Sequence, residues 1–239
     1  MIPEICNAQG ERLDHTFHAG APGCNEILVI GHGVTGNKDR PALVALSEAA
    51  AAVGIPSLRI SFAGNGDSGG CFEDSTISKE VEDLGSVLDA LDEWEIGYVG
   101  HSMGGAVGVL RAASDPRIKT LVSLAGMVNT ADFLERKFGA LTPGEGFMWD
   151  KPECPLSQSY ADDMRSIDTV LPQAADIGIP WLLVHGSADE VVLPRDSQAA
   201  LAANNGRTQL LELDGADHVF SNESTAAMTT GVINWLQNR

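Results

Sequence analysis

The chain has 239 residues, 44% of them hydrophobic, which is enough to bury the core of one sizeable domain. Its 33 acidic and 15 basic side chains give a net charge of −18, so its surface should repel nucleic acid and anionic membranes. No apolar run reaches the roughly 18 residues that suggest a membrane span, and the residues after Met1 lack the basic and apolar parts of a secretory signal.

The four cysteines are Cys6, Cys24, Cys71 and Cys154, and none of them forms a C-x-x-C pair. Their spacing matches no metal-binding pattern, so we expect no metal ion. We interpret them as free thiols in a reducing cytoplasm, with one disulfide as the alternative.

Apolar runs alternate with helical patterns along most of the chain. Two short strands around a hairpin turn at residues 7–10 are expected within residues 2–19. The further strands expected are 27–30, 57–62, 96–99, 120–125, 181–185 and 208–213, and the helices are about 41–53, 78–94, 103–113, 194–204 and 222–237. Such alternation predicts an α/β fold with a mostly parallel central sheet and helices on both faces.

Residues 127–178 break this rhythm, because they are rich in Pro, Gly, Asp, Met and Trp. A long irregular insert in a compact domain is usually functional. We therefore expect residues 1–239 to form a single domain in which 127–178 make a small cap over a site.

The most informative turn is Gly100-His101-Ser102-Met103-Gly104, between an apolar strand and a helix of small residues. A serine at the apex of a sharp strand-to-helix turn has crowded backbone around it, and glycines two positions away on either side relieve that crowding. The helix N-terminus also favours nearby negative charge. The pattern predicts a nucleophilic Ser102; a glycine-rich turn without chemistry is the alternative.

A serine nucleophile needs a base to take its proton and a third group to orient the base. Asp189 and His218 each follow a predicted strand, at the sheet edge where open α/β sheets place their sites. The order Ser102, Asp189, His218 is the one expected for such a triad. Glu190 is the rival acid. This chemistry requires no metal and no organic cofactor.

Several polar residues near these motifs have a structural interpretation instead. His32 and His101 should brace the loops of the site, and His185 should be a satisfied buried side chain. Asp217, beside the base, is also assigned a structural role. For the oxyanion, we expect backbone N–H donors from Met103, directly after the nucleophile, and from Val34, in the loop after strand 27–30.

Apolar side chains of the expected cap are the candidates for a substrate pocket. We expect Phe138, Phe147, Met148 and Trp149, together with Val191, to line it. The alternative is that the aromatic and Met side chains only anchor the cap to the core.

From about residue 26 onward the chain resembles the α/β-hydrolase superfamily. The stretches 31–38, 59–68, 100–105 and 185–189 are similar to cinnamoyl/feruloyl esterase-like carboxylesterases. That group often has Phe where this chain has Val34, and His where it has Asn65. The change at Val34 removes an aromatic wall that a feruloyl substrate would use.

These features together predict a serine carboxylester hydrolase that acts on small to medium acyl esters through an acyl-enzyme. The ligand expected is a small-molecule ester, without nucleic acid or membrane partners, and a homodimer is allowed. Hydroxycinnamate esterase and acyl thioesterase are the alternative activities. A non-catalytic ligand-binding module is the alternative of another class.

Overall fold

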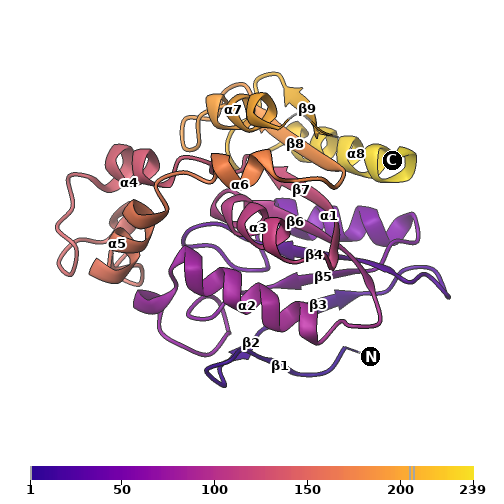
Figure 1. Cartoon of the computed structure of the whole chain (residues 1–239), viewed down its shortest axis with the longest axis horizontal. Helices are drawn as coiled ribbons and strands as arrows, with labels where there is room; N and C mark the ends of the chain where they lie inside the picture. Colours follow the sequence, from indigo (N-terminus) through magenta and orange to yellow (C-terminus); the bar gives the residue numbers. More distant parts are fainter. Residues whose placement is uncertain (1, 205, 207) are drawn as a thin grey trace.

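The computed structural model describes residues 2–204, 206 and 208–239, and within these residues seven strands form one sheet (Figure 1). Its order is β3-β5-β4-β6-β7-β8-β9. β3 runs antiparallel to β5, and the other neighbouring pairs are parallel. The predicted α/β fold with a mostly parallel sheet is therefore confirmed. The strands are β3 (His15–His18), β4 (Glu26–Gly31), β5 (Ser57–Ile60), β6 (Glu95–His101), β7 (Ile118–Leu124), β8 (Trp181–Gly186) and β9 (Thr208–Leu213).

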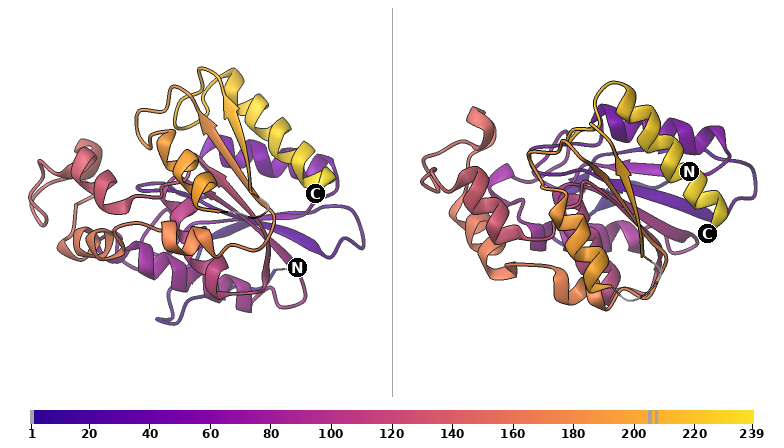
Figure 2. Two further views of the ribbon diagram at one scale, coloured as in Figure 1. Left: turned by 45° about the horizontal axis from the view of Figure 1, so that its top comes forward. Right: turned by 90° about the horizontal axis from the view of Figure 1, so that it is seen from above.

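Helices cover both faces of the sheet, because its central strands are apolar on both sides (Figure 2). Along β4, Ile27 and Val29 pack into one core, and Leu28 and Ile30 pack into the other. One face carries α1 (Pro41–Ala52) and α8 (Glu223–Asn238), and the opposite face carries α2 (Ile77–Asp89), α3 (Met103–Ser114), α6 (Leu171–Ala175) and α7 (Arg195–Ala203).

The N-terminal residues form the predicted hairpin and one strand more. β1 (Ile5–Cys6) pairs antiparallel with β2 (Arg12–Leu13). The Asn7 Oδ1 atom accepts hydrogen bonds from the backbone N–H groups of Gln9 and Glu11, at 3.1 and 2.9 Å, and so holds the turn. β3 lies within the residues expected for this hairpin, but it forms the antiparallel edge of the large sheet instead.

Residues 127–178 lie between β7 and β8, and the expectation of an irregular segment there was wrong. The segment contains α4 (Thr130–Phe138), the short 3-10 helix η2 (Met148–Asp150), α5 (Gln158–Ile167) and α6. α4 and α5 project beyond the end of the sheet (Figure 1). Each has a buried stripe, with Phe133 and Phe138 on α4 and Tyr160 and Met164 on α5. The high content of Pro, Gly and Asp in the loops masked these two helical periods.

The insertion, residues 127–178, is fixed to the body of the molecule at its start. The buried carboxylate of Asp196, on α7, accepts hydrogen bonds from the backbone N–H groups of Val128 and Asn129, at 2.8 and 3.2 Å. The Asn129 side chain donates to the same carboxylate at 3.0 Å. Across the described residues, no helix is both long and apolar enough to span a membrane.

Candidate active site

Ser102 occupies the turn between β6 and α3, at the carboxyl end of the sheet. Its backbone has φ 56° and ψ −121°, a left-handed conformation that is uncommon for a residue with a side chain. The Ser102 N–H donates to the carbonyl of Leu124 at 2.9 Å, and its carbonyl accepts from Gly105 and Met127, each at 2.9 Å. These bonds on both sides hold the strained turn in place.

The two glycines that flank the serine are required by close backbone approach. A Cβ atom on Gly100 would lie 2.0 Å from the carbonyl oxygen of Gly104. A Cβ atom on Gly104 would lie 2.5 Å from the carbonyl oxygen of His32. The spacing of glycines around Ser102 therefore follows from how tightly β6, α3 and the loop after β4 pack.

The structure brings Ser102, Asp189 and His218 together, from three separate strand ends. The His218 Nε2 atom lies 3.0 Å from Ser102 Oγ, and its Nδ1 atom lies 2.8 Å from Asp189 Oδ2. Ser102 is 4% exposed, Asp189 is buried and His218 is half-buried. Glu190, the rival acid, is exposed and its side chain makes no hydrogen bond within the described residues. This geometry can deprotonate a hydroxyl and orient the base that does so.

The Asp189 carboxylate is held on both oxygens. Oδ1 accepts from the backbone N–H groups of Val191 and Val192, at 2.8 and 3.1 Å. Oδ2, besides contacting His218, lies 3.3 Å from the Nε2 atom of His185. Burial raises the pKa of Asp189, but the hydrogen bonds from His185, His218 and Val191 outweigh it, so the pKa lies below its ordinary range. The side chain is therefore ionised at neutral pH.

His185 and His101 contact the triad and hold its members in position. The His185 Nε2 atom is 3.0 Å from the Val192 carbonyl, which can only accept, so Nε2 carries the proton and Nδ1 accepts from Ser197 Oγ at 2.7 Å. By the same reasoning, His101 Nε2 donates to the His218 carbonyl at 2.9 Å. Burial lowers the pKa of His101 to about 3, so it is a neutral donor.

His32 fixes the loop that carries Val34. Its Nε2 accepts from the Phe62 backbone N–H at 3.0 Å, and its Nδ1 therefore donates to the Gly33 carbonyl, at 2.9 Å. Burial lowers the pKa of His32 to about 4. His32, His101, His185 and Asp217, which accepts from Ser221, make the kind of structural hydrogen bonds expected for them.

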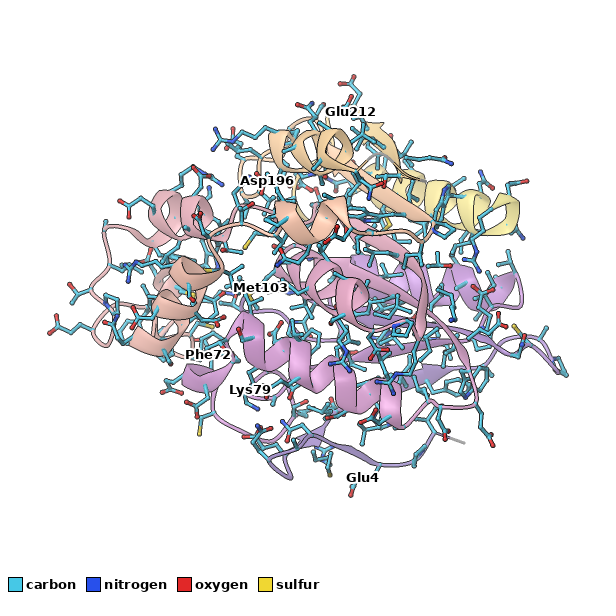
Figure 3. All side chains as sticks on the ribbon, in the orientation of Figure 1. Glu4, Phe72, Lys79, Met103, Asp196 and Glu212 are labelled. Atoms are coloured by element: carbon cyan, nitrogen blue, oxygen red, sulfur yellow. The ribbon has the colours of Figure 1, made fainter. Side chains whose placement is uncertain are left out.

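The N–H groups of Val34 and Met103 face no protein acceptor within the described residues. Val34 lines the pocket beside Ser102, and Met103 is the first residue of α3 (Figure 3). The Met103 side chain contacts α5, where its Sδ atom is 3.0 Å from the Tyr160 hydroxyl. Two unpaired N–H groups next to a serine hydroxyl can stabilise a negatively charged oxygen.

A pocket of about 190 Å³ opens above Ser102. Of the five side chains expected to line it, Trp149 and Val191 do so. Phe138 and Met148 are buried in the core instead, and the centroid of the Phe138 ring lies 4.9 Å from that of Trp149. Phe147 is 42% exposed and does not line the pocket. The buried side chains of the insertion join the core on the face of the sheet covered by α2 and α3, so only part of the insertion faces the serine.

Sequence reasoning missed several pocket residues, namely Arg40, Phe133, Lys151 and Val219. Val219 adjoins His218, and Arg40 follows the loop of Val34, so proximity to assigned residues was an available signal. Lys151 lies two residues after Trp149, so the same signal was available for it, although its charge gave no reason to place it in an apolar pocket. Within the described residues, no group of three or more His, Cys, Asp or Glu is arranged to hold a metal ion.

Curated proteins similar to this chain include the bovine and human proteins named "Palmitoyl-protein thioesterase ABHD10, mitochondrial". The bovine protein is 27% identical over 204 residues, which cover 80% of this chain and 63% of the relative. The human protein is 33% identical over 162 residues, which cover 62% of this chain and 52% of the relative. The chain thus spans between half and two thirds of the length of these relatives.

Solved structures show the same architecture. Est1E from Butyrivibrio proteoclasticus with bound ferulic acid has a TM-score of 0.88 at 24% identity, covering 99% of this chain and 98% of that one. Mouse alpha/beta hydrolase domain-containing protein 10 has a TM-score of 0.83 at 18% identity, covering 100% and 99%. At these identities the likeness concerns the fold. The model of the alpha/beta hydrolase family matches residues 27–229, and the chain belongs to this family.

Proposed function

We propose that this protein is a serine carboxylester hydrolase for small to medium acyl esters. The observation that carries the proposal is the chain of two hydrogen-bond distances, 3.0 Å from Ser102 Oγ to His218 Nε2 and 2.8 Å from His218 Nδ1 to Asp189 Oδ2. The serine faces a pocket with an apolar wall of Phe133 and Val191. A nucleophile, a base and an orienting carboxylate in this order support acyl transfer.

In the proposed reaction, Ser102 Oγ attacks the ester carbonyl carbon while His218 Nε2 takes the hydroxyl proton. The N–H groups of Val34 and Met103 stabilise the oxyanion, each by roughly 3 kcal/mol in the transition state. The intermediate collapses, and His218 gives its proton to the departing alkoxide. Water then attacks the acyl-enzyme with His218 again as base, and this releases the acid and restores Ser102. Asp189 stabilises the charged His218 in both steps.

Acyl thioester hydrolysis is the second candidate, and the similarity to the palmitoyl-protein thioesterases favours it. The same residues would serve, with a thiolate as the leaving group. Hydroxycinnamate esters remain an alternative through the structural likeness to Est1E, although this chain has Val34 at the pocket wall. We keep the expected cytoplasmic location within this proposal, supported by four unpaired cysteines; the curated relatives are named as mitochondrial.

The test combines active-site labelling with a substrate panel. The wild-type protein should react with a fluorophosphonate probe, and Ser102→Ala should lose this reaction together with at least a thousandfold of its p-nitrophenyl butyrate hydrolysis. Ser114→Ala, at the exposed end of α3, is the matched control and should behave as wild type. A folded wild-type protein without labelling would indicate a ligand-binding module.

The substrate panel decides between the candidate activities. It compares p-nitrophenyl esters of increasing acyl length, acyl thioesters of the same lengths, and methyl ferulate. Highest kcat/KM on a short or medium oxygen ester supports the proposal. Highest kcat/KM on a thioester or on ferulate would replace it by the corresponding alternative.

A further inference from the structure

Two positively charged side chains stand in the wall of the pocket beside Ser102, in a protein whose net charge is −18. Arg40 precedes α1, Lys151 follows η2, and both are half-buried. The residues that line this pocket include no Asp and no Glu in the described part of the chain. The charged side chains of the pocket lining are therefore positive, opposite in sign to the net charge of the molecule.

Arg40 and Lys151 also lack the carboxylate partners that most basic residues of this chain have. Ion pairs in the described part of the chain hold ten other Lys and Arg side chains, for example Lys38 with Asp39 and Arg117 with Asp115. Among the described residues, no carboxylate lies within 4.0 Å of Arg40 or Lys151. In so acidic a chain, two unpaired cations at one pocket are unexpected.

The Arg40 side chain is held in position, but most of its hydrogen-bond donors have no protein acceptor among the described residues. One guanidinium nitrogen donates to the Thr35 carbonyl at 2.8 Å. This is the single hydrogen bond that the Arg40 side chain makes to the described residues. A guanidinium has five N–H donors in a rigid fork that fits a carboxylate or phosphate. Arg40 and Lys151 line a second pocket as well, which adjoins the first along Thr35 and Gly36 and also has Glu153 in its wall. The two cations thus stand where the two pockets meet.

The charge of Arg40 also reaches the groups around the serine. Burial is the main cause of the low pKa values of His101 and His32, and the positive charge of Arg40 lowers both further. Removing a cation partly from water costs free energy unless an opposite charge compensates for it. Both cations are half-buried, and the carboxylate of Glu153, which lines the second pocket, forms no ion pair with either of them. An anionic ligand in the first pocket would therefore meet no competing carboxylate among the described residues of the pocket wall.

We propose that the substrate carries an anionic group, a carboxylate or a phosphate, which Arg40 and Lys151 bind while its apolar part contacts Phe133, Trp149 and Val191. The proposal rests on the proposed ester hydrolysis at Ser102, and it narrows the substrate class. The charge belongs either to the acyl part or to the alcohol part of the ester. In both cases an ion pair at the pocket wall orients the ester carbonyl toward Ser102.

The experiment has two arms, one for each place of the charge. The acyl arm compares the p-nitrophenyl monoester of glutarate with p-nitrophenyl valerate, which has the same number of acyl carbons. The alcohol arm compares the butyrate ester of para-hydroxybenzoate with that of its methyl ester. Each kcat/KM is divided by the rate of alkaline hydrolysis of the same ester, so that the ratio within an arm reports recognition.

We expect the anionic ester to be favoured by about tenfold in one arm, as one well-placed ion pair provides. Lys151→Met and Arg40→Gln should each lower this ratio at least threefold. Lys119→Met, which removes an exposed cation far from the pocket, should leave the ratio as in wild type. A neutral ester favoured in both arms, or an equal ratio in wild type and Lys151→Met, would overturn the proposal. Lys151→Met decides the test if Arg40→Gln disturbs the Thr35 loop.

A binding measurement separates this proposal from the proposed reaction. Ser102→Ala protein is titrated calorimetrically with phenylbutyrate and with phenylbutyramide. Tighter binding of the carboxylate, abolished by Lys151→Met, supports the cation site even if no ester in the panel is hydrolysed. Equal binding of acid and amide contradicts it even if the ester hydrolysis is found.

Discussion

His101 Nε2 donates a 2.9 Å hydrogen bond to the backbone carbonyl of His218, and the two imidazole rings lie 4.9 Å apart. The residue before the nucleophile therefore holds the loop that carries the base. His101→Leu removes the donor and should lower kcat for p-nitrophenyl butyrate by about tenfold, because His218 is no longer held in position against Ser102. His101→Gln, which can still donate, should retain more activity. Equal kcat for the two variants would show that the hydrogen bond does not position His218.

The Asp189 carboxylate is the second target. Asp189→Asn removes the charge that orients and stabilises protonated His218, and kcat should fall by about a thousandfold or more. The lowered pKa of Asp189 also stabilises the fold. That contribution is complete above the ordinary Asp pKa of about 3.9 and is lost as the pH falls through the lowered value.

The difference in melting temperature between wild type and Asp189→Asn should therefore be constant from about pH 7 to pH 5, and should shrink below about pH 4. Thermal melts followed by circular dichroism across this range measure it. A difference that instead grows in acid would mean that the carboxylate is not the stabilising form.

Acid should destabilise the protein through its buried histidines. The pKa values of His32 and His101 are lowered to about 4 and about 3, whereas the unfolded chain has an ordinary value near 6.5. Below about pH 6.5 the unfolded state binds more protons than the folded state, so stability falls as the pH drops toward those lowered values.

Each buried histidine contributes up to about 1.4 kcal/mol per pH unit to this loss. His101→Gln removes one of the two groups, so its unfolding free energy should depend less steeply on pH between pH 6 and about pH 4. Urea titrations at several pH values compare the slopes. Identical slopes would mean that His101 is charged in the folded state.

The Asp196 carboxylate anchors the insertion and can be tested by stability. Asp196→Ala leaves the Val128 and Asn129 N–H groups without their acceptor in a buried place. The free energy of unfolding should decrease by about 2–3 kcal/mol, as expected for charge-assisted hydrogen bonds. Asp132→Ala, which removes surface ion pairs with Arg136 and Arg195, is the control and should cost less than about 1 kcal/mol. Similar losses would argue against the anchor.

Trp149 and Phe147 offer a matched pair of aromatic residues. They are two positions apart and 38% and 42% exposed, but the Trp149 side chain lines the pocket and Phe147 does not. Trp149→Ala should raise KM for p-nitrophenyl butyrate several-fold through lost apolar contact, whereas Phe147→Ala should not. If both variants changed KM alike, exposure rather than pocket position would be the cause.

The strands of the sheet and the polar residues at their ends could be predicted from the sequence. Buried strands appear there as continuous apolar runs, and turns are marked by glycines. The glycine pattern at Gly100 and Gly104 marks a backbone crossing that only small residues allow. α4 and α5 were missed, since each has a short buried stripe within loop-rich surroundings. The wall contributed by Lys151 depends on how the insertion folds back over the sheet, and no local pattern in the sequence encodes that.

The insertion leaves the sheet after β7 and rejoins it at β8, and these two strands lie next to each other. Because β7 and β8 run parallel, the insertion starts at the carboxyl end of the sheet and returns to its amino end, while Ser102, Asp189 and His218 all lie on other segments. A descendant chain could vary the part of this segment that holds α4 and α5 without shifting the reacting atoms, as long as the Met127 N–H still binds the Ser102 carbonyl. Among relatives of this protein, the range of accepted substrates can thus diverge faster than the reaction itself.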